Sequence, residues 1–462
     1  MSRSRATVVL IAAIAAVLAG APQAGAAERL LTLYSPQLES QPYVHITHEV
    51  NLKPDGREAP AEPGYVTGIA EEVLVDSKDP NAKPLPVRKM MVHHFLYYAR
   101  GRVNDNVPGS CFNGLGFITG RGEEHPDGKF GIYFPSIFRD RYGIENRTAD
   151  GRAPGWHLTA MVMNHYQRQK KFYVRTKLWY TTDPRETIYP VVVGDCSKLA
   201  NGMSYDVPGG GRPGSTFKNT STWTVPPGFN GRIFGAHSHH HGGAKDQVLT
   251  SDTCHRELFR AHTYYGLPNH PYNTVRPILH EPGPIANGTL GTLSGVPIHE
   301  GEVLRQTSYH DNSNLHVAAM GFWTLFVARD NSVGTCAPVP KDIVELGKPA
   351  RYDHTPNFGL VVPQLTKPAG QLRPLAARPP TVGDEFFRPG RVSIRRGQTV
   401  TWRFSGLEPH SVTVANGPRG FSSVYWGQSA GTSYSFRPTV RGTYRLTCLV
   451  HPTTMAQTLV VR

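Results

Sequence analysis

The sequence has no long apolar run beyond its N-terminal segment. After residue 26, no stretch approaches the roughly 18 uninterrupted apolar residues of a membrane-spanning helix, so we expect no membrane span. Lys and Arg number 49 against 35 Asp and Glu, but the basic residues are dispersed and form no patch interleaved with aromatic residues. The charge therefore predicts a weak attraction to anionic surfaces and gives no nucleic-acid signature.

Amphipathic helices are also missing from the pattern between residues 27 and 345, and no internal repeat is visible. In their place, 47 glycines and 39 prolines separate short alternating segments with many Tyr, Thr and Val residues. This pattern favours an all-β protein with many turns. A length of 462 residues suits about three domains. We expect two β-sandwiches at 27–200 and 201–345, a proline-rich linker at 346–379, and a third domain at 380–462.

The first 26 residues have the pattern of a secretory signal peptide. Arg3 and Arg5 form a basic start, residues 8–18 form a short apolar core, and residues 24–26 give the small-residue cleavage pattern Ala-Gly-Ala. The sequence therefore predicts a secreted or periplasmic protein.

The C-terminal segment carries the most specific motif. Cys448, His451 and Met455 fall within eight residues, and His410 lies 38 residues before the cysteine. A thiolate, two imidazoles and a weak axial thioether suit a one-electron Cu(I)/Cu(II) couple. Residues 391–404 and 442–448 alternate as strands do. The alternative is a free cysteine beside two ordinary histidines.

Residues 380–462 resemble plastocyanin-like cupredoxins through this motif and its flanking strands. The resemblance implies a Greek-key β-sandwich that holds one type 1 (blue) copper and transfers electrons. Its ligands would be His410, Cys448, His451 and Met455.

Only four cysteines remain after Cys448 is assigned to copper. In an exported protein, Cys111, Cys196, Cys254 and Cys336 permit two disulfides in three connectivities. Cys196 and Cys336 flank a single candidate domain, so we favour that bridge, with Cys111 to Cys254 as the second.

Histidines cluster before the linker in patterns that metal sites require. His93 and His94 are adjacent in an apolar strand, so both can bind one metal only if the backbone bends or the pair sits at a strand end. His237 and His239 stand two apart on a strand, which points both to one face. His165 closes another apolar strand, and Met320 lies within one. Taken singly, each could be an ordinary core or edge residue, and residues 239–241 could scavenge metal adventitiously.

The order of these motifs resembles the copper type II, ascorbate-dependent monooxygenases, the family of peptidylglycine α-hydroxylating monooxygenase. That resemblance covers residues 85–330 and implies two jelly-roll-like sandwiches, each with one type 2 copper. It places an electron-transfer copper at His93, His94 and His165, and a catalytic, dioxygen-binding copper at His237, His239 and Met320. Residues 239–243 and 308–327 are also similar to the stress-up-regulated nodulin family of plants.

The resemblance has departures. Gly235 stands where the peptide-hydroxylating enzymes have a substrate-anchoring arginine, and Phe322 and Thr324 stand where they have Asn and Tyr. A peptide ending in glycine is therefore not the expected substrate. Further imidazoles could replace or supplement a ligand, and they are His240, His241, His310 and His316.

These observations predict an exported multi-copper redox protein. Blue-copper electron transfer would serve a monooxygenase-like centre that activates dioxygen on an organic substrate; the sequence identifies neither that substrate nor the electron donor. The main alternative is a non-catalytic copper-binding protein or electron carrier, since a ligand set does not prove an activity. A third alternative treats the sandwiches as glycan- or wall-binding modules without metal.

Overall fold

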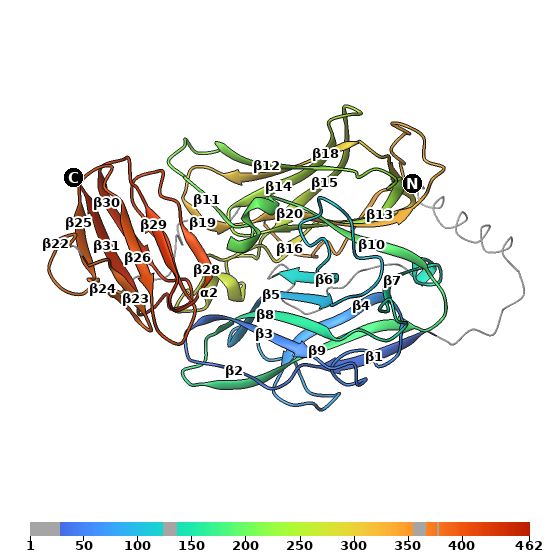
Figure 1. Ribbon diagram of the computed structural model, residues 1–462, viewed down its shortest axis with the longest axis horizontal. Coiled ribbons are helices and arrows are strands. Elements are labelled where there is room, and N and C mark those ends of the chain that lie inside the picture. Colours follow the sequence, from blue (N-terminus) through green and yellow to red (C-terminus); the bar gives the residue numbers. More distant parts are fainter. Residues whose placement is uncertain (1–27, 123–135, 354–365, 377) are drawn as a thin grey trace, which may run out of the picture.

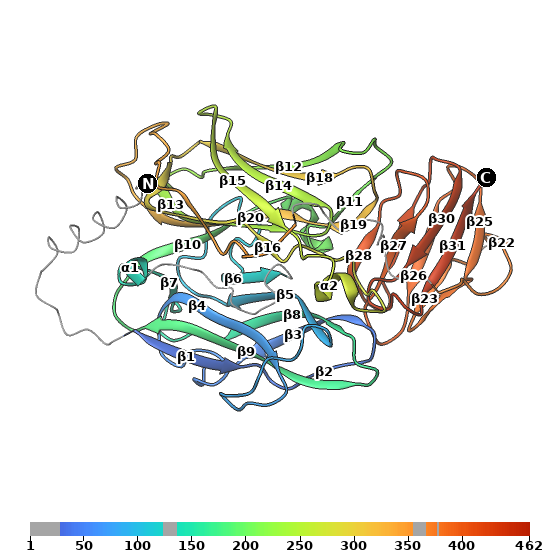
Figure 2. The same cartoon turned by 180° about the vertical axis from the view of Figure 1, so that it is seen from behind.

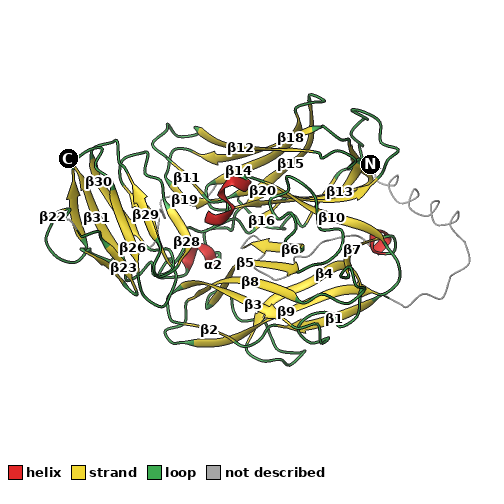
Figure 3. Cartoon of the chain, viewed as in Figure 1, coloured by secondary structure: helices red, strands yellow, loops and turns green. Residues whose placement is uncertain are grey.

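The computed structural model describes residues 28–122, 136–353, 366–376 and 378–462, and the predicted signal peptide lies outside them. The regular secondary structure of the described residues is almost all strand, which confirms the all-β prediction (Figure 3). Its helices have one or two turns: α1 Ser136–Arg139, the 3-10 helix η1 Cys196–Asn201 and α2 Pro271–Thr274. None of the helices in these ranges is long and apolar enough to cross a membrane.

The first sandwich packs two layers of strands around its own apolar core. One layer has the order β3-β8-β5-β6, with β3 His45–Leu52, β8 Trp156–Asn164, β5 Met90–Ala99 and β6 Phe117–Gly122. The other contains β1 Arg29–Tyr34, β2 Leu38–Ser40, β4 Gly64–Val75, β7 Tyr142–Asn146 and β9 Lys170–Thr181.

The second sandwich has the same two-layer design and a separate core. Its inner layer contains β10 Glu186–Val193, β13 Gly231–His240, β17 Thr289–Ile298, β20 Gly321–Arg329 and β21 Val344–Leu346. Its outer layer contains β12 Thr216–Thr224, β14 Ala244–Ser251, β15 Arg256–Tyr264, β16 Ala286–Asn287 and β18 Val303–Asp311. A ribbon beside them pairs β11 Tyr205–Val207 with β19 His316–Ala319.

One sheet joins the two sandwiches. A short parallel pairing of β10 with β7 makes a continuous ten-stranded sheet of the layer β1-β9-β4-β7 and the layer β10-β20-β13-β17-β21. Strand β10 precedes the domain boundary expected at residue 200, yet it pairs along its length with β20. The two sandwiches therefore lie one above the other around shared strands (Figure 1).

The C-terminal sandwich stands against the ends of both others (Figures 1 and 2). Its larger sheet contains β22 Arg373–Pro374, β25 Arg391–Ile394, β31 Ala456–Val461, β30 Gly442–Thr447, β27 His410–Asn416 and β28 Val424–Gln428. Its smaller sheet contains β24 Phe386–Arg388, β23 Thr381–Gly383, β26 Val400–Phe404 and β29 Ser433–Phe436. Part of the expected linker, β22, is thus a strand of this domain; residues 354–365 and 377 of that linker lie outside the described residues.

Specific hydrogen bonds fix the C-terminal sandwich to the rest of the chain. Asp206 accepts hydrogen bonds from the hydroxyls of Ser423 and Tyr425, at 2.7 and 2.6 Å. The backbone N–H of His45 donates to the carbonyl of Val450 over 3.1 Å. An apolar contact lies between these two points and contains Val317, Ala318, Tyr425 and Leu449.

The disulfide pairing predicted from the sequence is wrong. The structure pairs Cys111 with Cys196 and Cys254 with Cys336. The expectation assumed that a bridge closes one domain. Instead, the loop that contains Cys111 lies against β10, and the backbone N–H of Cys111 donates to the carbonyl of Val192. Cys196 follows directly after β10, so it meets Cys111 instead of Cys336.

Candidate metal centres

The C-terminal motif converges inside its sandwich. Cys448 directly follows β30, and His410 begins the neighbouring strand β27. The Cys448 Sγ atom lies 4.0 Å from Nδ1 of His410 and 3.8 Å from Nδ1 of His451. An ion between them could reach all three at ordinary ligand distances of about 2.0–2.3 Å. Met455 is fully buried in the same turn, where its N–H donates to the carbonyl of His451.

The electrostatics of this site favour a thiolate. Burial alone would raise the pKa of the Cys448 thiol, but hydrogen bonds with His410 and His451 lower it to about 6. Burial would lower the pKa of His451, whereas Cys448 and Glu408 raise it to about 10. The donor set is therefore one soft anion with two imidazoles, which is the set that copper prefers in electron-transfer sites.

Carboxylates orient both imidazoles of this site. The Nε2 atom of His410 lies 3.1 Å from Asp384, and Nε2 of His451 contacts Glu408. With each Nε2 held by a carboxylate, Nδ1 faces Cys448 and is the atom that would bind the ion. These two carboxylates are residues that the sequence pattern did not single out, because they lie in loops with no ligand spacing.

A second group of donors lies between the first two sandwiches. Six buried histidines meet there from both sandwiches, and we call them the histidine hexad: His45, His93, His94, His239, His241 and His280. His45 begins β3, His93 and His94 lie on β5, and His239 lies on β13. His241 follows β13, and His280 lies in the loop between α2 and β16.

One half of the hexad has a convergent set of ring nitrogens. The Nε2 atom of His94 lies 3.0 Å from Nε2 of His239 and 3.2 Å from Nε2 of His241. Nδ1 of His241 donates to the carbonyl of Ala318 over 2.6 Å, which leaves its Nε2 as a lone-pair donor. Nitrogens bound tetrahedrally at about 2.0–2.1 Å stand about 3.3 Å apart, so this trio has the spacing of a metal site.

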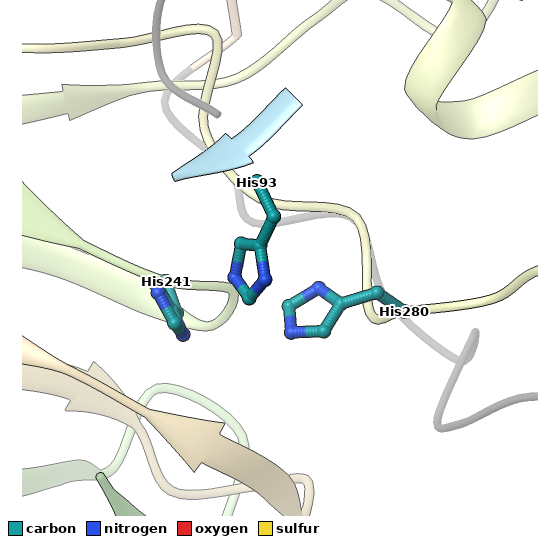
Figure 4. A group of neighbouring side chains, drawn as sticks. All are labelled: His93, His241 and His280. Carbon is teal, nitrogen blue, oxygen red and sulfur yellow. The ribbon is translucent and has the colours of Figure 1, made fainter. Parts of the chain in front are cut away.

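A second group, which shares His241 with the first, surrounds His93. Its ring lies between those of His241 and His280, with centroids 4.8 and 4.4 Å away (Figure 4). The potential ligand atoms of these three residues all lie within 4.8 Å of one another. On the remaining side, Nε2 of His45 lies 2.6 Å from Nδ1 of His93. His280 donates from Nδ1 to the carbonyl of Glu281, which directs its Nε2 away from that bond.

A bulge allows adjacent histidines to share this place. The pairing of β5 with β8 shifts register between Val92 and His94. Neighbours on a regular strand point to opposite faces, but a bulge turns two successive side chains toward one side. The rings of His93 and His94 are accordingly 4.2 Å apart. The bulge is the backbone bend that His93 and His94 need if both are to bind one metal.

Three members of the hexad have the protonation state that metal binding requires. Burial, followed by neighbouring histidines, holds the pKa of His45, His93 and His241 well below the usual range. These rings are therefore neutral at pH 7, and neutral imidazole is the form that binds metal.

The structure groups the expected ligands differently from the resemblance. His239, His93 and His94 lie in the hexad, but Nδ1 of His237 contacts the hydroxyl of Thr289 instead. His165 joins neither histidine group of the described chain; it lines a small hollow beside His280, and burial lowers its pKa to about 4. Met320 lies with Met203 and Phe322 in a buried cluster.

Three of the extra imidazoles lie beside the hexad in polar networks of their own. His240 contacts Thr263, His310 contacts the hydroxyl of Tyr205 at 2.8 Å, and His316 pairs with Glu281 at 2.5 Å. The fourth, His241, is a hexad member. Sequence reasoning missed His45 and His280, which have no ligand spacing and reach the site from a strand start and a loop.

An open cavity of about 760 Å³ adjoins both centres. Its lining comes from all three sandwiches and includes His94, Met320, Glu408 and Val450. We call it the three-domain cavity.

Topology and ligand placement give the C-terminal sandwich a cupredoxin-like fold. No protein-family model and no curated protein matches the chain. A solved structure of a reduced amicyanin variant is 26% identical, over 19% of this chain and 86% of that one, with a TM-score of 0.17. The copper-containing nitrite reductase of Thermus scotoductus SA-01 is 15% identical, over 53% of this chain and 57% of that one, with a TM-score of 0.16. The match thus spans less than two thirds of that reductase, and at these TM-scores neither likeness bears on the function of this chain.

Proposed function

We propose that this chain is an exported copper redox protein whose C-terminal type 1 centre exchanges electrons with a copper centre in the histidine hexad. The observation that carries the proposal is a backbone hydrogen bond that joins a histidine of the hexad to the segment carrying two of the type 1 ligands. Val450 lies between Cys448 and His451, and its carbonyl accepts the N–H of His45, a hexad member. Copper at both places would supply one-electron couples and, at the hexad, a binding position for dioxygen.

The donor chemistry supports a different role for each centre. Cys448 offers a thiolate in a fully buried place, with its two imidazoles held by carboxylates, so little has to move when the charge of the site changes. The hexad offers imidazoles alone, in two trios that share His241, and suits one or two non-blue ions. Met320 and His94 both line the cavity, and a thioether near an ion at the hexad would favour the reduced state.

The contact between the centres favours transfer within one molecule. From Cys448, the backbone leads to the Val450 carbonyl, across a 3.1 Å hydrogen bond to His45, and through its ring to Nδ1 of His93 at 2.6 Å. The Asp206 contacts hold the same interface closed. Transfer therefore needs no diffusion of a tethered domain, which the long linker alone would have required. Two disulfides fit export to an oxidising compartment.

The proposal is tested by copper counting together with electron paramagnetic resonance of the full chain. We expect one blue copper and up to two non-blue coppers. When the hexad is reduced and the type 1 centre is oxidised, the blue colour should bleach at a rate independent of protein concentration. The reduced protein should also consume dioxygen, in a phase that depends on an organic substrate. Blue copper alone, with an empty hexad, would contradict the proposal; both centres loaded without dioxygen consumption would leave the electron-carrier alternative.

The variant His45→Phe tests the proposed electron path between the two centres. Phenylalanine keeps the backbone N–H that bonds Val450 but removes the ring nitrogen that meets His93. We expect slower bleaching with an unchanged blue spectrum. His262→Phe is the matched control, because His262 is half-exposed and paired with Asp246 on β14, outside the hexad. Equal bleaching rates in the two variants would remove His45 from the path.

A further inference from the structure

We propose that the three-domain cavity binds an uncharged, apolar organic molecule, and that this molecule is the substrate of the hexad. The inference rests on the proposed function for the word substrate, whereas the binding site stands on the cavity itself. A volume of about 760 Å³ lies within the range of about 300–1,000 Å³ that small-molecule sites occupy.

The walls of the cavity are mainly apolar. They combine residues of β3, β5 and β8, the η1 helix, the start of β20 and three loops of the C-terminal sandwich. The apolar members include Leu96, Phe112, Leu199, Met203, Phe322 and Leu407. Enclosing an apolar molecule among such side chains gains roughly 25 cal/mol for each Å² removed from water.

The charges around the cavity exclude an anionic occupant. Lys and Arg number 49 in the sequence, yet none of the described residues that line the cavity is either of them. Its two acids are already engaged: Glu49 accepts from Thr159 and contacts His157, and Glu408 contacts His451. In the metal-free protein an anion would find no cation among these lining residues and would face both carboxylates. A neutral molecule meets no such cost.

The position of the cavity joins it to both centres. His94 and Met320 belong to its lining, so an occupant lies beside the ring nitrogens of the hexad. Leu407 also lines the cavity and is 98% exposed, and its own backbone N–H donates to Asp384 over 3.0 Å. Asp384 also contacts Nε2 of His410, so the loop that walls the cavity is held by a carboxylate of the type 1 site.

The first test uses metal-free full-length protein and two fluorescent probes with the same ring system. N-phenyl-1-naphthylamine is uncharged, and its sulfonated analogue 1-anilino-8-naphthalenesulfonate is an anion. We expect one uncharged probe to bind per chain, about tenfold or more tighter than the anion, which corresponds to about 1.4 kcal/mol. Equal affinity for the two probes, or tighter binding of the anion, would overturn the proposal.

Filling variants locate the binding. Ala200 and Ala430 are exposed residues that line the cavity, so Ala200→Trp and Ala430→Trp should fill it without disturbing a core. Each should weaken binding of the uncharged probe about tenfold or more. Leu293→Trp is the control, because Leu293 is exposed on β17 and does not line the cavity. Unchanged binding in both filling variants would overturn the assignment.

A second readout uses copper-loaded protein. Because His94 lines the cavity, the uncharged probe should alter the paramagnetic resonance spectrum of the non-blue copper, and Ala200→Trp should abolish that change. Probe binding without any copper in the hexad would overturn the proposed function and leave the cavity assignment standing. Copper loading without probe binding would overturn the cavity assignment alone.

Discussion

Asp206→Asn should stabilise the protein above pH 6 and have little effect near pH 4. Asp206 lies on β11 of the second sandwich and accepts hydrogen bonds from Ser423 and Tyr425 of the C-terminal sandwich. Burial raises the pKa of its carboxyl from 3.8 to about 6, although both hydrogen bonds oppose that change. The fold therefore favours the protonated acid at the interface on which the proposed electron path depends.

The sign and size of this stability difference follow from proton linkage. Because the folded pKa lies above the unfolded value, the stabilisation is complete below pH 3.8 and is lost as pH rises through about 6. The difference between 3.8 and about 6 corresponds to about 3 kcal/mol in the free energy of unfolding. Asparagine cannot ionise, yet its oxygen can accept from Tyr425 and its amide can donate to the Ser423 hydroxyl. At pH 7 the variant should be more stable by up to about 3 kcal/mol.

The assay is urea unfolding of the metal-free protein between pH 4 and 8, followed by tryptophan fluorescence. The advantage of Asp206→Asn should grow between pH 4 and 6 and then level off. Asp330→Asn is a control of opposite sign, because hydrogen bonds from Ser332 and Arg232 lower the pKa of Asp330 to about 2. That variant should be less stable than the parent at pH 7, by an amount that shrinks toward pH 2. Parallel pH profiles for the parent and Asp206→Asn would refute the reasoning.

Three further outcomes are expected. Cys448→Ser should abolish the intense blue absorption of copper-loaded protein, whereas Met455→Leu should keep it at an altered reduction potential, since the axial bond is weak; a blue serine variant would contradict the type 1 assignment. In a chain that holds three coppers, His94→Ala combined with His239→Ala should remove one non-blue copper without changing the blue band, whereas His237→Ala should retain all three because its ring contacts Thr289; an unchanged copper count in the double variant would refute the trio of His94, His239 and His241. Gly243→Ala should lower the thermal midpoint more than Gly228→Ala, because both have positive φ but only at Gly243 would a Cβ atom meet a ring, that of His316; equal losses would show that the ring moves aside.

The sequence indicated the all-β class and the C-terminal ligand group because both are local properties. Alternation and turn residues specify strands segment by segment. Three of the four C-terminal candidates lie within eight residues, and His410 arrives on β27, which pairs with the strand that leads into Cys448. The structure brings His410, Cys448 and His451 together accordingly.

The spacing of histidines in the sequence predicted only part of the histidine hexad. A pattern shows which face of a strand a histidine occupies, but not which other strands lie opposite that face. His239 and His94 were singled out because each has a histidine neighbour, whereas His45 and His280 have no such signal and depend on how the layers pack. The bulge at Val92 is likewise a property of the pairing between β5 and β8, which the residues of β5 alone do not specify.

What the sequence by itself determined is therefore the strand content, the cysteine that remains free and the residue types available as ligands. Only the tertiary structure decided the disulfide pairs, the membership of the hexad and the contact between Val450 and His45. The physical reason is the separation along the chain of the residues that interact. Strand formation depends on neighbours along the chain, whereas these contacts join segments far apart in the sequence that meet only when the strands and sandwiches pack.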